Sequence, residues 1–143
     1  MLVSTKGRYA LRVMIDLAEH STQGPIALSV IAHRQDISAK YLESIIKLLV
    51  KARFLRGTRG KGGGYQLIKP PEQYTVGAIL RLTEESLAPV ACIDQNAPAC
   101  PRAPECRTLS MWCGLDQVIS SYLDKITLAD LSRPEVVQGE PSS

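Results

Sequence analysis

The sequence contains no long apolar run and little histidine. No stretch approaches the roughly 18 apolar residues that a membrane-spanning helix needs, and residues 1–12 lack the apolar core of a signal peptide. We therefore expect a cytoplasmic protein with no membrane partner. The two histidines, His20 and His33, are far in sequence from every cysteine.

Recognisable enzyme signatures are also missing. The glycine-rich segment 59–64 lacks the Lys-Ser/Thr pair of a phosphate-binding loop, and no cofactor fingerprint occurs elsewhere. An enzyme with a reactive cysteine is a weak alternative, because no histidine accompanies the cysteines in sequence, although sequence distance does not exclude proximity in space. The sequence favours a protein that is not an enzyme.

Charge is distributed unevenly along the 143 residues. Residues 1–75 carry twelve lysines and arginines against five aspartates and glutamates, whereas residues 76–143 carry five against nine. A solvated surface usually mixes the two signs within a segment, so this segregation favours a nucleic-acid partner for the first half. The length suits one domain, or one small domain with an appendage.

Three helices are expected in the basic half. The first begins at a cap, Ser4 or Thr5, and continues to about His20; the second covers 29–35, after an extended segment 25–28; the third follows a turn at 36–38, with Ser38 as its N-cap. The apolar residues at helical spacing, which we expect to be buried, are Ala10, Leu11, Met14, Leu17, Ala18, Val30, Ile31, Leu42, Ile45, Ile46 and Leu49.

Two helices joined by a tight turn are typical of a helix-turn-helix, whose second helix enters the major groove of DNA. A strand at 54–56, a glycine-rich tip at 59–64 and a strand at 65–68 then predict a β-hairpin wing. The predicted fold class is mainly α with a small β-hairpin wing: a winged helix-turn-helix domain over 1–82 and a long dimerisation helix.

The predicted DNA contacts come from the first helix, the recognition helix and the wing. Lys40 is expected to reach phosphate or guanine, and Glu43 can either accept from a cytosine amino group or simply pair with Lys47. The complete set is Lys6, Arg8, Ser38, Lys40, Tyr41, Glu43, Ser44, Lys47, Arg56, Arg59, Gly60 and Lys61.

Four cysteines lie in the acidic half, at Cys92, Cys100, Cys106 and Cys113. Their spacing is not the paired Cys-x-x-Cys of zinc ribbons, and a reducing compartment disfavours disulfides, although a regulatory thiol switch stays open. The first three lie on a loop with proline and alanine that can wrap around an iron-sulfur cluster. Cys106 also precedes a helix expected near Thr108, whose N-terminus favours a thiolate.

An apolar seam follows the cysteines. Residues at spacings of three and four indicate a helix that packs against another helix, either within the chain or in a second copy, and the short chain favours a symmetric dimer. We assign a connector and cysteine loop to 83–108, a dimerisation helix to 109–131 and a flexible tail to 132–143. The seam residues are Trp112, Leu115, Ile119, Tyr122 and Ile126.

Three motifs in order resemble the Rrf2 family of bacterial winged-helix regulators. They are the segments 4–11 (STKGRYAL), 37–43 (ISAKYLE) and 59–65 (RGKGGGY), and the likeness extends from residue 1 to about 131. The resemblance implies a homodimeric transcription factor that binds double-stranded promoter DNA, with a palindromic site as the expected target.

The resemblance also bears on the cysteines. Cluster-binding, IscR-like members have three cysteines before the long helix, and Cys92, Cys100 and Cys106 match them. A histidine three residues beyond the third cysteine completes the site in those members, whereas this chain has Leu109, so the fourth ligand is unassigned and Cys113 is a further candidate. A two-iron, two-sulfur cluster is favoured over a four-iron, four-sulfur one, and the alternative is a cluster-free, thiol-based or cysteine-metabolism regulator.

Overall fold

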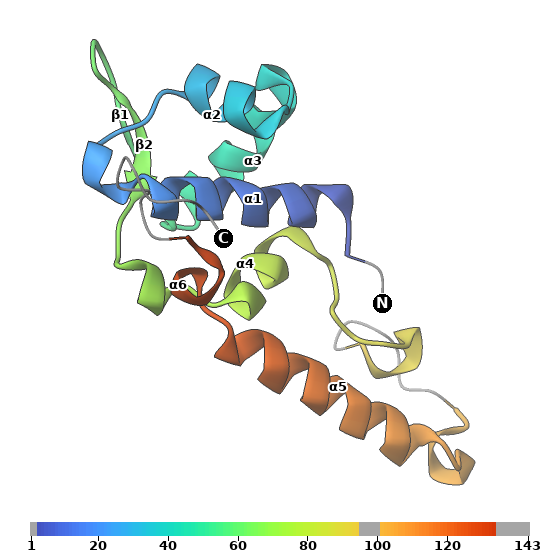
Figure 1. Ribbon diagram of the computed structural model, residues 1–143. Coiled ribbons are helices and arrows are strands. Elements are labelled where there is room, and N and C mark those ends of the chain that lie inside the picture. The colour runs from blue at the N-terminus through green and yellow to red at the C-terminus, as the bar shows by residue number, and fades with distance from the viewer. Residues whose placement is uncertain (1–2, 95–100, 134–143) are drawn as a thin grey trace.

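Helix α1 (Thr5–Glu19) runs through the middle of the protein in the computed structural model, which describes residues 3–94 and 101–133. Helices α2 and α3 and the hairpin lie on one side of α1, and α4, α5 and α6 lie on the other (Figure 1). Ser4 caps α1, since its Oγ accepts from the Gly7 N–H at 3.0 Å. The buried face of α1 includes Val13 in addition to the predicted residues, whereas Leu11 is only partly buried.

Helices α2 (Leu28–Gln35) and α3 (Ala39–Lys51) form the predicted helix-turn-helix. Asp36 ends α2 in the left-handed region, and Ser38 caps α3 by accepting from the Tyr41 N–H at 3.2 Å. The four predicted apolar residues of α3 are buried, and Ile31 of α2 is buried as well. Burial of Val30 was a wrong prediction, because this side chain is 43% exposed on the outer face of α2.

The wing is the antiparallel pair β1 (Leu55–Thr58) and β2 (Gly64–Leu67), with Leu55 opposite Leu67. Ile26 adds a short bridge to Tyr65, through hydrogen bonds of 2.8 and 2.9 Å between their backbones. Gly64 permits this approach, because its φ is +152° and a Cβ would overlap the Ile26 carbonyl. The base of the hairpin is therefore attached to the segment that precedes α2.

Helix α4 (Val76–Thr83) and helix α6 (Leu128–Leu131) complete the domain on the other side of α1. Thr75 caps α4, accepting from the Ala78 N–H at 3.1 Å. Leu128 is fully buried in the main core, and the backbones of residues 74–76 and 126–128 are hydrogen-bonded to each other. Short 3-10 helices at Ser21–Gln23, Pro71–Gln73, Ala91–Ile93 and Ala103–Glu105 connect the longer elements.

Helix α5 (Leu109–Lys125) extends away from the rest of the protein (Figure 1). A single helix over 109–131 was a wrong prediction: α5 ends at Lys125, and Thr127 and Asp130 form a capping box that starts α6. The first tail residues are also attached, because the Ser132 N–H donates to the Leu128 carbonyl at 2.9 Å and the Arg133 N–H to Glu19 Oε2 at 2.7 Å. The rest of the predicted tail, 134–143, lies outside the described residues.

The elements assemble into a mostly helical fold with a two-stranded hairpin. Within 3–94 and 101–133, no helix is both long enough and apolar enough to cross a membrane. This arrangement confirms the predicted fold class.

Candidate nucleic-acid interface

One face of α3 is covered by exposed polar and basic side chains. Its opposite face is buried against α1 and α2, so the helix presents a single outer surface. Glu43 and Lys47 form an exposed ion pair of 3.5 Å, which is the solvated pairing that the sequence offers as an alternative to base contact. Ser44 donates its hydroxyl to the Tyr41 carbonyl at 2.6 Å. The exposed residues of this face are Ser38, Lys40, Glu43, Ser44, Lys47 and Lys51.

Aromatic and cationic contacts with α1 fix the N-terminal end of α3. Tyr41 is partly buried and packs edge-to-face on Tyr9 of α1, with ring centroids 5.8 Å apart. The Arg12 guanidinium lies over the Tyr9 ring, 5.0 Å from its centroid, and donates to the side chain and the carbonyl of Gln35. Arg12 therefore links α1 to the end of α2, a role that is absent from the predicted site.

A buried carboxylate fixes α2 on α1. Asp16 is 1% exposed and accepts from Arg34 Nη2 at 2.6 Å, Arg34 Nε at 3.0 Å and Gln35 Nε2 at 2.8 Å. His20 Nδ1 lies 2.7 Å from the Asp16 carbonyl oxygen. This network was not predicted from the sequence, in which its signal is a charged residue inside an otherwise apolar helical stripe. Because α2 positions α3, Asp16 supports the recognition helix indirectly.

The wing presents basic residues beside α3. Arg56, Arg59 and Lys61 are exposed, and the Gly60 backbone has the positive φ of +93° that the tight tip requires. The Gln66 amide, oriented to satisfy its neighbours, accepts from Arg56 Nε and Nη2 at 3.2 and 2.7 Å. Arg56 is thus held across the hairpin, and the residues at the tip extend into solvent.

The two predicted contacts of the first helix are placed differently. Arg8 is exposed and donates to Thr5 Oγ1 at 3.2 Å within α1. Lys6 lines a depression between the start of α1 and the connector, together with Glu84, Glu85 and Asp94. Negative charge of the same chain therefore surrounds Lys6, and its contact with phosphate stays a prediction.

Glu84 joins the connector to the start of α1, an interaction that the sequence does not reveal. Its Oε1 accepts from the Ser4 N–H at 2.6 Å and from the Ser4 hydroxyl at 2.8 Å. Gly7 lies directly beside this carboxylate, where a Cβ would overlap Glu84 Oε1. The segment that leads to the cysteines is thus tied to the helix that supports the DNA-binding elements.

The cysteines flank a segment that the structure does not describe. Cys92 is exposed in the 3-10 helix Ala91–Ile93, Cys106 is half-buried just before α5, and Cys113 is exposed on α5; Cys100 lies outside the described residues. Within the described ranges, no three potential metal ligands lie together. The donor types suit a thiolate-ligated cluster, because Cys92 and Cys106 lie on either side of Cys100 in the sequence.

The environment of Cys106 favours its thiolate. Its Sγ lies 3.5 Å from Thr108 Oγ1, and this hydrogen bond, aided by the backbone N–H groups of Thr108 and Leu109, lowers the pKa of the Cys106 thiol. These groups belong to the first turn of α5, as expected for a cysteine at a helix N-terminus. Leu109 is the first residue of α5 and carries no donor atom for a metal.

Helix α5 has an unusually apolar outer face. None of its residues is buried within the chain, and four apolar side chains at spacings of four, three and four are 40 to 64% exposed. The predicted seam is divided: Leu115 and Tyr122 belong to this exposed stripe, while Trp112 and Ile119 are partly covered and Ile126 packs on Val76 and Leu80. The exposed stripe, which we call the α5 face, is Met111, Leu115, Val118 and Tyr122.

Comparison with known proteins places this geometry in a family. Residues 3–134 match the sequence profile of the Rrf2 family, described as an iron-dependent transcriptional regulator. The chain is 41% identical over 133 residues to protein rrf2 of Nitratidesulfovibrio vulgaris, covering 93% of this chain and 88% of that protein. It is 40% identical over 131 residues to the HTH-type transcriptional regulator IscR of Serratia proteamaculans, covering 92% and 79%.

Solved structures give the same result. IscR of T. potens superposes with a TM-score of 0.73 at 39% identity, covering 92% of this chain and 85% of that one. CymR (YrzC), the global cysteine regulator of B. subtilis, superposes with a TM-score of 0.76 at 33% identity, covering 92% and 96%. These relatives are regulators and not enzymes. With its helix-turn-helix, basic wing and long α5, the chain belongs to the Rrf2 family of DNA-binding transcriptional regulators.

Proposed function

We propose that this chain is a homodimeric regulator that holds a palindromic promoter site with α3 and the wing, and that an iron-sulfur cluster sets its affinity. The observation that carries the DNA-binding part is that α3, whose basic residues are exposed, and the exposed basic hairpin lie on the same side of α1 (Figure 1). A major groove admits a helix, and the backbone phosphates beside it attract a protruding basic ribbon.

The predicted contact residues take different roles in this proposal. Lys40, Lys47 and the wing residues Arg56, Arg59 and Lys61 neutralise phosphates, while Ser38, Tyr41 and Ser44 fix the helix end against the groove and Gly60 lets the tip approach the backbone. Glu43 discriminates between sites, because its exposed carboxylate, which lies 3.5 Å from Lys47, can accept from a cytosine amino group. Lys6 and Arg8 contact phosphate beside the start of α1.

A second copy of the chain covers the α5 face. Four exposed apolar side chains on one stripe are unusual for a protein that works as a monomer, and the stripe has the spacing of a helix-helix seam. Trp112 and Ile119 lie at the edge of the same seam. A symmetric pair then presents two α3 helices to an inverted repeat.

Cys92, Cys100 and Cys106 hold the cluster in this proposal, with Cys113 as the candidate for the unassigned fourth position. The cluster, when bound, supplies a centre that responds to iron, oxidants or nitric oxide. The lowered pKa of Cys106 and the iron-dependent description of the family support it. Anchoring Cys106 restrains the first turn of α5, and anchoring Cys92 restrains the connector that Glu84 ties to Ser4.

The alternative is a cluster-free regulator that uses thiol chemistry. It is favoured by the exposed Cys92 and Cys113, by the thiolate character of Cys106, and by the match to CymR, which is described as a cysteine regulator. In that case the same cysteines respond to oxidants by forming disulfides.

Protein purified without oxygen separates the two functions. Visible absorption with stoichiometric iron and sulfide supports the cluster, and colourless, iron-free protein supports thiol chemistry. The affinities of holo and apo protein for a duplex selected from random DNA are then compared, and coupling of ordinary size gives a difference of about 5- to 150-fold. Equal affinities and equal footprints would remove the sensing part of the proposal.

A further inference from the structure

Helix α5 is joined to the rest of the protein near its C-terminal end. The Val76 N–H donates to the Ile126 carbonyl and the Leu128 N–H to the Tyr74 carbonyl, each at 2.9 Å. Leu123 and Ile126 add apolar contacts to the small cluster around Leu80. These contacts fix the C-terminal end of α5. The direction in which the rest of the helix extends depends on the contacts made by its last turn.

An ion pair between α4 and α5 holds that turn. Arg81 Nη1 and Nη2 donate to Asp124 Oδ1 and Oδ2 at 2.7 and 3.1 Å, so two planar groups meet in parallel. This bidentate arrangement defines direction as well as distance. Gly77 lies one turn before Arg81, and a Cβ on it would overlap Asp124 Oδ1. We call this ion pair the Arg81–Asp124 clamp. Its geometry requires glycine at position 77.

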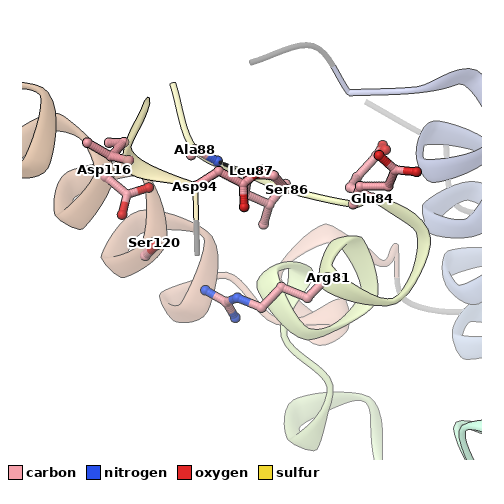
Figure 2. Close-up of a pocket in the computed structure, with 10 residues that line it drawn as sticks. Arg81, Glu84, Ser86, Leu87, Ala88, Asp94, Asp116 and Ser120 are labelled. Atoms are coloured by element: carbon pink, nitrogen blue, oxygen red, sulfur yellow. Dashed lines mark hydrogen bonds between the residues drawn. The ribbon is translucent and has the colours of Figure 1, made fainter. Parts of the chain in front are cut away.

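Beyond the clamp, α5 is separated from the connector by open space. A pocket of about 260 Å³ lies between α4, the connector and α5, and its lining includes Leu87, Asp116 and Ser120 (Figure 2). Arg81 extends along the α5 side of this pocket, while Glu84 lies at the opposite end near α1 (Figure 2). No residue of α5 is buried, and side chains such as Ile119 and Ser120 are only partly covered along this length.

The clamp lies near the C-terminal end of α5, whereas most of the α5 face lies farther along the helix toward its N-terminus. Thirteen residues separate Asp124 from Met111, which is roughly 20 Å of helix at 1.5 Å per residue. A small rotation at Asp124 consequently moves the α5 face by a much larger amount. If that face pairs with a second copy, the same rotation changes the distance between the two recognition helices.

We infer that Arg81 and Asp124 are positioning residues that determine which half-site spacing the dimer accepts. This inference rests on the proposed dimeric DNA binding. In this inference, neither residue contacts DNA. The clamp fixes the angle between α5 and the winged-helix domain. In a symmetric dimer, that angle determines the distance between the two α3 helices. An exposed ion pair contributes little to stability, so its loss alters geometry without unfolding the protein.

The experiment measures affinity across a series of spacers. An inverted-repeat duplex is selected from random DNA with the wild-type protein, and its spacer is then shortened or lengthened by one and two base pairs. The wild type should prefer one spacer by about tenfold or more, as expected for a geometrically defined dimer. Arg81→Met and Asp124→Asn should reduce that preference to about threefold or less, or move it to another spacer.

Two further variants sharpen the test. Gly77→Ala keeps both charges and should displace Asp124, giving the same altered profile although alanine favours the helix. Lys125→Gln removes a charge from the same turn of α5 outside the clamp and should keep the wild-type profile. The thermal midpoint and the dimer mass are measured in parallel for every variant.

The outcomes separate the two proposals. A wild-type spacer preference retained in folded, dimeric Arg81→Met and Asp124→Asn proteins would overturn the clamp alone. A wild type that binds every spacer equally, or binds no duplex, would overturn the dimeric DNA-binding proposal and the clamp with it. If Arg81→Met fails to fold, the nearly isosteric Asp124→Asn decides the result.

Discussion

The Asp16 carboxylate lies inside the protein, and Arg34 is the cation that makes this burial tolerable. Asp16 is 1% exposed, whereas the Arg34 side chain is 29% exposed. Removal of the cation leaves a buried charge beside the Gln35 amide, which donates to it, and the His20 ring, whose Nδ1 lies 3.8 Å from Asp16 Oδ1. Neutralising the carboxylate instead leaves a guanidinium that can reach water. The two halves of this pair are therefore not equivalent.

We expect Arg34→Met to lower the free energy of unfolding by about 2 to 3 kcal/mol, because it leaves the buried Asp16 charge uncompensated. Asp16→Asn should cost about 1 kcal/mol, since the lost hydrogen bonds leave no buried charge behind. Urea denaturation at neutral pH measures both values. The reverse order of the two variants would contradict this account of the pair.

We expect Thr108 to increase the reactivity of Cys106. Its hydroxyl is the main cause of the lowered pKa of the Cys106 thiol, so more thiolate is present near neutral pH than for an ordinary cysteine. In apo protein, Thr108→Ala should raise this pKa and slow alkylation of Cys106 by iodoacetamide near pH 7. The two rates should converge at high pH, where the thiol is ionised in both proteins.

Peptide mass spectrometry against time measures the alkylation rate at Cys106 separately from that at Cys113. Thr108→Ser retains the hydroxyl and is the matched control, with an expected rate close to wild type. Equal rates for the alanine and wild-type proteins at pH 7 would show that Thr108 has no such role.

Individual side chains were predictable where one helix face was enough to place them. The exposure of Lys40, Ser44 and Lys47 follows from their spacing, because the apolar stripe of α3 fixes which face is outward. The roles of Asp16 and Glu84 were not predictable, since their partners lie 18 and 80 residues away along the chain. Such pairs depend on the tertiary fold, which local periodicity does not contain.

At the scale of elements, α5 combines features that helices of monomers rarely show together. It has 17 residues and none of them is buried, yet the α5 face is apolar. The core of the winged-helix domain is closed by α6 instead, through the fully buried Leu128. The exposed stripe is therefore available to another chain.

Val118→Glu should convert the dimer to a monomer, because Val118 is 64% exposed at the centre of the α5 face and a charge there opposes burial. Analytical ultracentrifugation measures the mass, and affinity for the selected duplex should fall by about 100-fold or more as one half-site is lost. Gln117→Glu, on an exposed polar position of the same helix, is the control. A dimer that survives Val118→Glu would refute this seam.

The order of the helices and strands could be predicted from the sequence. The residues at which they begin and end were predicted less accurately. Helix α2 begins at Leu28, one residue before the predicted start, and the predicted helix over 109–131 is interrupted after Lys125. The interruption results from the Thr127 capping box, in which local hydrogen bonds outweigh an apolar periodicity that continues through Ile126. The exposed apolar stripe also differs from the predicted seam: Ile126 packs within its own chain, and Met111 and Val118 are exposed instead.

At the scale of the whole molecule, charge and architecture coincide. The basic residues 1–75 form the helix-turn-helix and the wing, while the acidic second half forms most of the opposite side of α1, including α5. The sequence predicted this division because charge segregation is a property of composition. It did not predict the two polar contacts at the end of α4, Arg81 to Asp124 and Glu84 to Ser4, that connect the halves.

In the proposed function, the basic half of the chain holds DNA by the exposed face of α3 and by the wing. The most direct test is the affinity of Lys40→Glu/Arg59→Glu for the selected duplex, against Arg102→Glu/Lys125→Glu, which makes the same change in net charge outside residues 1–75. For the first protein, we predict that the affinity for DNA falls by about 100-fold or more. We also predict that the slope of log affinity against log salt concentration becomes smaller by about two units. The second protein should show little change in either quantity. Unchanged affinity in a folded Lys40→Glu/Arg59→Glu protein, or equal losses in both, would contradict the account.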